Sequence, residues 1–411
     1  MRIGILATRL SGTDGVSLEV AKWVGVLRRN GHEVFFCAGE LGGYAAEGTL
    51  IPKMHFTHPE ILALTQAAFA KTANKSTDEI LNEIDKLAHE MKAPLLAFVQ
   101  ENHLDALVVQ NVFAIPMNLP LAKVAAEIIQ ENSFPTVAHN HDYYWERERF
   151  QTGLIPEFLE TYFPPDLPDI IHVCINSIAQ NRLKRRRGID SVNIPNVFDF
   201  NITSPVRKTL NPAFRSALQL NEDEPLIIQP TRVIQRKGIE MAIELVAAMD
   251  LKQKKLFITH AAGDEGLDYW HWIVHEAQMM GVELRLVDEM IKEVAGNNTF
   301  SLADAYHHAD LVTYPSIYEG FGNALVEAVF YKCPVVVNRY PVYNSDIRPL
   351  GFQFIELNGY VNESAIQRAN QVIYGAASIQ EMVEHNFTVA KKHFSMEVLE
   401  QKLLAVIENL L

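Results

Sequence analysis

Cysteine is scarce in this sequence, and the three that occur, Cys37, Cys174 and Cys333, stand far apart with no C-x-x-C pair. This spacing excludes a disulfide framework and a structural zinc site built on cysteines. Uninterrupted apolar runs of about 18 residues are missing too. The opening letters, MRIGILATRLSG, read as a strand and not as an export signal. We therefore expect a cytoplasmic protein with no membrane span.

Basic charge is also in short supply, because 36 Lys and Arg oppose 50 Asp and Glu, a formal net charge of −14. Binding to phosphate-rich surfaces depends on Lys and Arg, so we expect neither a nucleic-acid partner nor stable insertion into a membrane. The one basic run, KRRR at residues 184–187, precedes Gly188. A helix end, where cations face the negative end of the dipole, explains this run better than an anionic docking patch.

Short apolar runs alternate with helical patterns along the chain, which is typical of parallel sheets covered by helices on both faces. In the first half the expected strands are residues 2–8, 32–39, 105–111, 135–140 and 169–176. In the second half they are residues 224–232, 254–263, 282–288, 309–316 and 333–339. The sequence therefore predicts an α/β protein with two parallel sheets, and open sheets of this kind bind ligands beyond the carboxyl ends of their strands.

A segment rich in proline and asparagine, IPNVFDFNITSPVRKTLNP, separates the two halves and reads as a linker. We expect an N-terminal domain at residues 1–204 and a C-terminal domain at residues 205–385. Residues 386–411 are expected to form terminal helices that return to the N-terminal domain.

The stretch YPSIYEGFGNALVEAVFY, residues 314–331, passes from a strand through a turn with two glycines into an amphipathic helix. The first amides of such a helix form an anion site. Glu319 lies just before these amides and Glu327 lies more than one turn inside the helix. Carboxylates accept hydrogen bonds from sugar and ribose hydroxyls, so the pair suits a ligand with both phosphate and hydroxyls. Alternatively, Glu319 complements the helix dipole and Glu327 is an exposed helix residue, but this explains the glycines poorly.

Four stretches resemble, in the right order, motifs of the retaining family-4 glycosyltransferases. They are AHNHD at 138–142, IPNVFD at 194–199, TRVIQRKG at 231–238 and EGFGNALVE at 319–327, the last with the E-x7-E spacing of the family. The likeness runs along the whole chain. It implies the GT-B architecture, in which two Rossmann-like domains face each other across a cleft. The N-terminal domain would then lie on the acceptor side and the C-terminal domain on the donor side.

The resemblance assigns roles to the donor-side residues. Arg232 and Lys237 would hold the diphosphate of a nucleotide sugar and stabilise the leaving nucleoside diphosphate, a task that metal ions perform in other transferases. Glu327 would accept hydrogen bonds from the ribose, and Glu319 from the transferred sugar. Backbone contacts to the donor would come from the residues between the glutamates, namely Phe321, Gly322, Asn323 and Ala324. The sequence has no D-x-D motif, so we expect no metal and no other cofactor.

In the first half, SGTDGVS at residues 11–17 resembles the glycine loop of the family, whose backbone approaches the donor diphosphate at a helix start. Gly15 would lie at that approach. The loop departs from the common paired-glycine form because Thr13 and Asp14 stand between its glycines. Asp14 suits either a ligand of acceptor hydroxyls or the cap of the following helix.

The histidine motif contributes His141, which the resemblance assigns to a hydroxyl of the transferred sugar and to alignment of the acceptor. His139 and Trp145 are candidate acceptor residues, and for Trp145 packing within the domain is an equal alternative. A metal held by His139, His141 and Asp142 is a weaker hypothesis, because no further ligand shares their spacing. We therefore expect His141, Arg232, Lys237 and Glu319 to be the catalytic set.

The function implied is transfer of a hexose, from a donor of the UDP-glucose or GDP-mannose type, to a hydroxyl of a small soluble acceptor. The same architecture also carries nucleotide-sugar 2-epimerases, which convert the donor without an acceptor, so fold alone does not decide. A non-catalytic protein that binds nucleotide sugars is the third alternative. A further likeness is to transferases that build compatible solutes.

Overall fold

A computed structural model describes residues 1–12, 15–70, 75–202, 213–221, 223–263, 266–292, 299–375 and 378–410. The chain divides into two compact units, of which the first comprises Met1–Asn196 with Met396–Leu411 and the second Val197–Ser395. The sequence placed the boundary after residue 204, which lies outside the described residues. The terminal segment 386–411 is divided between the two units, with the break after Ser395.

The first unit is built on a seven-stranded sheet in which all neighbouring strands are parallel, in the order β3-β2-β1-β4-β5-β6-β7. Its central strands are almost continuously buried, as expected for a sheet covered on both faces. The strands are β1 Arg2–Ala7, β2 Glu33–Ala38, β3 Gly48–Leu50, β4 Ala106–Gln110, β5 Thr136–Asn140, β6 Ile170–Cys174 and β7 Ser191–Asn193.

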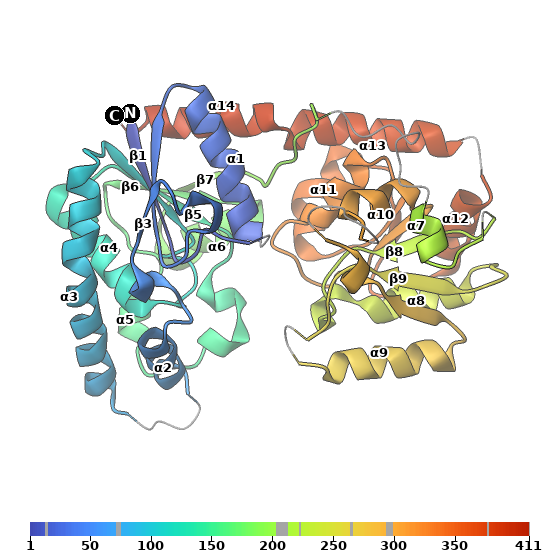
Figure 1. Ribbon diagram of the computed structural model, residues 1–411, viewed down its shortest axis with the longest axis horizontal. Helices are drawn as coiled ribbons and strands as arrows, with labels where there is room; N and C mark the ends of the chain where they lie inside the picture. The colour runs from blue at the N-terminus through green and yellow to red at the C-terminus, as the bar shows by residue number, and fades with distance from the viewer. Residues whose placement is uncertain are drawn as a thin grey trace. The chain divides into compact units, whose positions relative to one another are not determined.

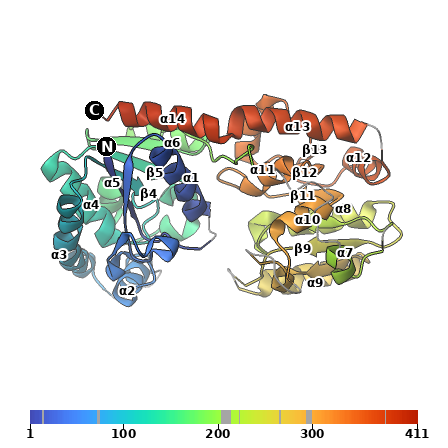
Figure 2. The same cartoon turned by 45° about the horizontal axis from the view of Figure 1, so that its top comes forward.

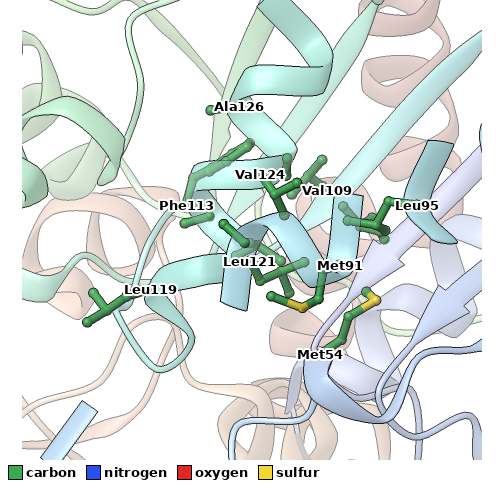
Figure 3. Packing of buried hydrophobic residues seen from close by; sticks show 14 of the residues in the cluster. Met54, Met91, Leu95, Val109, Phe113, Leu119, Leu121, Val124 and Ala126 are labelled. Carbon is green, nitrogen blue, oxygen red and sulfur yellow. The ribbon is translucent and has the colours of Figure 1, made fainter. Parts of the chain in front are cut away.

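Helices cover both faces of this sheet (Figure 1). They are α1 Gly15–Arg29, α2 Pro59–Ala68, α3 Thr77–Glu101, α4 Leu119–Asn132, α5 Pro156–Tyr162, α6 Ser177–Arg187 and α14 Met396–Glu408. The start of α3 is fixed by a capping box, in which Ser76 and Glu79 satisfy each other's backbone amides. Apolar side chains of α3, α4 and β4 interlock in the core of the unit, for example Met91, Leu121 and Val109 (Figure 3).

The C-terminal helix α14 packs beside α1 at the other end of the chain (Figures 1 and 2). Leu399 and Leu403 of this helix are fully buried. Its Glu400 accepts a hydrogen bond of 2.5 Å from Asn30, and Lys402 donates one of 2.9 Å to the carbonyl of Asn193. The first unit is therefore completed by the last residues of the chain.

The second unit has a six-stranded parallel sheet in the order β10-β9-β8-β11-β12-β13. Its strands are β8 Ile227–Gln229, β9 Lys255–Ile258, β10 Glu283–Leu286, β11 Leu311–Tyr314, β12 Val335–Asn338 and β13 Ile355–Leu357. Its helices are α7 Ala213–Ala217, α8 Ile239–Ala248, α9 Asp268–Met279, α10 Leu302–His308, α11 Asn323–Phe330, α12 Glu363–Ile373 and α13 Ser378–Phe394. The predicted fold class, two parallel α/β sheets, is confirmed.

Both sheets reverse their strand order at one point, between β1 and β4 in the first and between β8 and β11 in the second. Crossovers leave such a point in opposite directions, which opens a crevice at the carboxyl ends of the two strands. The motif TRVIQRKG follows β8, and Glu319, the first glutamate of EGFGNALVE, follows β11. The fold therefore brings these two motifs together at the switch point of the second sheet.

The basic run at 184–187 forms the last turn of α6, which ends at Gly188 in the left-handed conformation (φ 72°). The helix-end interpretation of this run is confirmed. Among the helices that the structure describes, none is long and apolar enough to cross a membrane.

Candidate functional site

Two loops of the second unit meet at the switch point, one after β8 and one after β11. Gly238 has a φ of 61°, and a Cβ at this position would lie 2.5 Å from the carbonyl oxygen of Pro315. The amide of Ile317 donates a hydrogen bond of 2.8 Å to the carbonyl of Arg236. Only glycine fits so close an approach of two backbones at a positive φ. The two loops are therefore held together by direct contacts between their backbones, independently of their side chains.

A buried carboxylate lies where these loops meet. Glu319 is only 7% exposed, and each of its oxygens takes one cation. Its Oε1 accepts a hydrogen bond from the ammonium of Lys237, and its Oε2 lies 2.8 Å from the Nη1 of Arg236. Arg236 also donates to the carbonyl of Tyr318 at 3.1 Å. The cluster of Glu319, Lys237 and Arg236, with one negative and two positive charges, is called here the glutamate clamp.

Burial and charge oppose each other in the glutamate clamp. Burial raises the pKa of Glu319, but the charges of Lys237 and Arg236 outweigh burial and hold that pKa below its ordinary value. Burial lowers the pKa of Lys237, and the carboxylate of Glu319 opposes this shift. The side chain of Lys237 is 11% exposed, so both members of this pair are largely removed from water. Such a pair is stable only when each charge keeps a partner.

The helix α11 begins directly after the glycine turn that the sequence singled out. Gly322 has a φ of 131°, and a Cβ there would lie 2.5 Å from the hydroxyl of Tyr340. That hydroxyl donates a hydrogen bond of 2.6 Å to the carbonyl of Phe321. The ring of Phe321 is buried against Phe394. The turn is thus fixed, while Asn323 and Ala324 form the first turn of the helix.

The second glutamate, Glu327, is half-buried on α11. Its Oε2 accepts a hydrogen bond of 3.1 Å from the hydroxyl of Tyr306 on α10. Burial, followed by the charge of Glu327, raises the pKa of Tyr306 well above its ordinary value, so this hydroxyl remains a donor. Glu327 is therefore held in one orientation, although it lies outside the glutamate clamp.

Arg232 follows β8 and is exposed. The backbone beneath it is anchored by two side chains at the carboxyl ends of adjacent strands. Gln229 donates to the hydroxyl of Thr231 at 3.0 Å and accepts from the hydroxyl of Thr313 at 2.6 Å. The charge of Arg232 also contributes to lowering the pKa of Lys237, after burial and the nearer Arg236. The second unit thus places three cations after β8.

In the first unit, His139 is a core residue at the end of β5. It is 1% exposed, its ring stacks on Trp23 of α1 at 4.2 Å, and its Nδ1 lies 2.9 Å from Oε1 of Gln110 on β4. Burial, helped by neighbouring His141, lowers the pKa of His139 well below its ordinary value. The imidazole is therefore neutral at physiological pH.

His141 lies just beyond β5, with its ring 4.4 Å from that of His139. Its amide donates a hydrogen bond of 3.1 Å to the side chain of Asn111, which adopts a positive φ of 58° at the end of β4. Asp142 forms an ion pair with Arg147. The three candidate metal ligands thus have other contacts, and no group of three or more such residues suited to a metal occurs in the described part of the chain.

Trp145 is packed inside the first unit. It is 8% exposed and its ring stacks on Tyr143 at 4.6 Å, in an apolar cluster that includes Cys174. The guanidinium of Arg186 lies 5.4 Å from its ring centre. The structure thus matches the packing alternative that the sequence left open for this residue.

The glycine loop of the first unit follows β1. Gly12 has a φ of 76°, and Gly15 is the first residue of α1. Ser11 donates a hydrogen bond of 2.5 Å to Glu40, and Ser17 donates to the carbonyl of Ser11 at 3.1 Å. The candidate acceptor residue Asp14 lies outside the described residues.

Several partners of the predicted residues were not found from the sequence. Arg236 and Tyr306 contact the two glutamates, and Trp23 and Gln110 contact His139. Arg236 is visible in TRVIQRKG directly before Lys237, but no pattern in the sequence indicates that it contacts Glu319. A buried tyrosine needs a hydrogen-bond partner, yet only the fold shows which one it takes.

The second unit also has an open concavity of about 500 Å³, whose lining includes neither of the two glutamates and none of the three cations after β8. Its walls include Arg348, Phe352, Glu356 and Arg368. It is therefore separate from the candidate site.

Among solved structures, Anabaena HepE in complex with UDP matches this chain with a TM-score of 0.65 and 15% identity, over 100% of both chains. At that identity the likeness shows the fold alone, and two Rossmann-like units of this kind form the GT-B architecture that the sequence predicted. Residues 211–371 match the family described as "Glycosyl transferases group 1". Because two curated relatives are also more than 30% identical to it over 90% or more of its length, the chain belongs to this family of glycosyltransferases.

Two curated relatives are similar over nearly the whole chain. The mannosylglucosylglycerate synthase of Petrotoga mobilis is 35% identical over 394 residues, which cover 90% of each chain. The mannosylglucosylglycerate synthase of Thermotoga maritima is 34% identical over 438 residues, which cover 98% of this chain and 99% of the relative.

The buried histidines of the first unit predict a loss of stability in mild acid. Burial keeps His139 neutral and lowers the pKa of His172 to about 4, whereas the unfolded chain protonates both near pH 6.5. The unfolded state then binds more protons, so the free energy of unfolding decreases as the pH is lowered. For each histidine the decrease approaches about 1.4 kcal/mol per pH unit below pH 6.5. In urea titrations at pH 7.5, 6.5 and 5.5, His139→Gln should show a shallower pH dependence, while exposed His275→Gln should match the wild type. Equal slopes in all three proteins would contradict this account.

Proposed function

We propose that this protein is a retaining, metal-independent hexosyltransferase that moves a mannosyl group from a nucleotide diphosphate mannose to a hydroxyl of glucosylglycerate. The observation that carries the proposal is the meeting of Arg232, Lys237 and Glu319 at the switch point of the second sheet. This is where open parallel sheets bind ligands, and it combines cations for a diphosphate with a carboxylate for hydroxyls.

The choice of sugar and acceptor rests on the two curated relatives. Their common name describes a product made of mannose, glucose and glycerate. Of the two donor types that the sequence left open, this product favours the GDP-mannose type. Glucosylglycerate is a small soluble acceptor, which is the class of acceptor that the sequence predicts. The three cysteines are free and buried, which suits a reducing cytoplasm.

In the proposed reaction, an acceptor hydroxyl oxygen bonds to the anomeric carbon while the bond from that carbon to the diphosphate breaks. The nucleoside diphosphate leaves with the electron pair, and its phosphate takes up the hydroxyl proton. Lys237 and Arg232 stabilise the charge that develops on the diphosphate, together with the first amides of α11. Glu327 holds the ribose, and His141 with Glu319 holds the transferred sugar.

The first test is a product assay in the presence of a strong chelator. The protein is incubated with GDP-mannose or UDP-glucose, each with and without glucosylglycerate, and nucleoside diphosphate release is measured. We expect release only with GDP-mannose and acceptor, and an NMR spectrum in which the new linkage keeps the configuration of the donor.

Other outcomes of this assay would overturn parts of the proposal. Conversion of donor without acceptor would identify an epimerase, and donor binding without turnover a binding protein. Inactivation by the chelator that a divalent metal restores would contradict metal independence.

Substitution of the proposed diphosphate ligands should slow turnover without unfolding the protein. Loss of one preorganised donor to a developing negative charge costs about 3–4 kcal/mol, or roughly a hundred- to thousand-fold in rate. We expect this loss of kcat for Lys237→Ala and for Arg232→Ala. Lys332→Ala, which removes a surface ion pair with Glu384 in the same unit, is the matched control. Near-normal turnover in either site variant would remove the assignment of that residue to the diphosphate.

The two glutamates should divide the donor between them. Glu327→Gln keeps an oxygen for Tyr306 but loses charge-assisted hydrogen bonds to the ribose, each worth roughly 1.5–3 kcal/mol. Calorimetry should therefore show at least tenfold weaker binding of the free nucleoside diphosphate. Glu319→Gln should not weaken this binding, because the free nucleotide has no sugar, but should depress turnover of the intact donor. Equal affinity losses in both variants would refute the division.

A further inference from the structure

Arg236, which directly precedes Lys237, is tied to the opposite loop at three points. Its Nη1 lies 2.8 Å from Oε2 of Glu319 and 3.1 Å from the carbonyl oxygen of Tyr318, and its own carbonyl accepts the amide of Ile317 at 2.8 Å. Its side chain is 36% exposed, whereas the side chain of Lys237 is 11% exposed. Arg236 thus closes the outer side of the glutamate clamp, and Lys237 forms its inner side.

The charges of the glutamate clamp create a constraint on Lys237. In this structure, its ammonium is bonded to Oε1 of Glu319. To bind a diphosphate, the ammonium of Lys237 has to replace its hydrogen bond to Glu319, in part or completely, by hydrogen bonds to phosphate oxygens. A carboxylate that is 7% exposed would then lose one of its two cations. Leaving a buried charge without a partner is strongly destabilising, so Lys237 can be released only if Glu319 retains another cation.

We propose that Arg236 is a positioning residue that keeps Glu319 ionised and in place while Lys237 turns to the diphosphate of the donor. This inference rests on the proposed nucleotide-sugar donor. The clamp contains one more positive than negative charge, so Glu319 keeps one full ion pair after Lys237 has moved. The bond from Arg236 to the carbonyl of Tyr318 fixes the guanidinium against the backbone that carries Glu319. Arg236 therefore acts through Glu319 and Lys237 and not by contact with the donor.

Two roles of Arg236 can be distinguished by experiment. Either Arg236 only joins the two loops, or it allows Lys237 to leave Glu319 for the diphosphate. If Arg236 only joins the loops, its loss should weaken ligand binding whatever residue occupies position 319. If Arg236 instead releases Lys237, its loss should matter only while a carboxylate at position 319 can retain Lys237. A double-mutant cycle between positions 236 and 319 separates the two roles.

The experiment measures the binding of GDP and of UDP by calorimetry to the full-length wild type, Arg236→Gln, Glu319→Gln and the double variant. For the nucleotide that the wild type binds, we expect Arg236→Gln to weaken binding at least tenfold, because Lys237 remains on Glu319. The double variant should bind within about threefold of Glu319→Gln, since the neutral amide no longer retains Lys237. Arg236→Lys keeps the charge and should bind within about threefold of the wild type.

Arg348→Gln is the matched control, because it removes another arginine–glutamate contact of the second unit, to Glu356 at 3.0 Å. It should bind the nucleotide like the wild type. The inference is overturned if Arg236→Gln binds as tightly as the wild type, if Arg236→Lys is as weak as Arg236→Gln, or if the double variant remains as weak as Arg236→Gln. If the wild type binds neither nucleotide, the proposed function fails and this inference with it. A failure limited to the variants leaves the proposed function standing.

Discussion

The candidate site depends on one buried carboxylate, that of Glu319, and on the two cations that share it. Removing this charge from water is unfavourable unless it is paired with a cation, so the loop after β11, which carries Glu319, has to meet the loop after β8, which carries the cations. Gly238 makes this meeting possible by letting its backbone approach the carbonyl of Pro315. The ion pairs and the backbone contacts therefore require each other. A site assembled in this way is preorganised, which is the condition for stabilising developing charge.

Each unit places its candidate residues at the same feature of its sheet. In a parallel sheet the carboxyl ends of all strands lie at the same end of the sheet, and the reversal of strand order leaves room there for a ligand. In the first unit the glycine loop, His139 and His141 lie at this end of the sheet. In the second unit the cations and both glutamates lie there. The two ends differ in charge. The neutral, buried His139 and the neighbouring His141 lie at the first, whereas the glutamate clamp and Arg232 lie at the second.

Much of the fold could be predicted from the sequence, because ten of the strands lie within apolar runs between turn signals. Three strands, β3, β7 and β13, were not predicted. Each has only three residues and lies at the edge of its sheet. A strand of this length shows no periodicity, and only its pairing with a neighbour defines it. The linker between the units was recognised by its prolines, but composition could not fix the residue at which contacts change from one unit to the other.

The sequence by itself determined the glycosyltransferase family, because the spacing of Glu319 and Glu327 and the motif TRVIQRKG are local properties of the chain. Only the tertiary structure decided what each residue touches. Glu319 and Glu327 look alike in the sequence, but one is buried between two cations and the other accepts from a tyrosine. Arg236 looks like an ordinary surface cation until its loop meets residues more than 80 positions away. Pairing of distant charges depends on how the strands are ordered in the sheet, and no short stretch of sequence encodes that order.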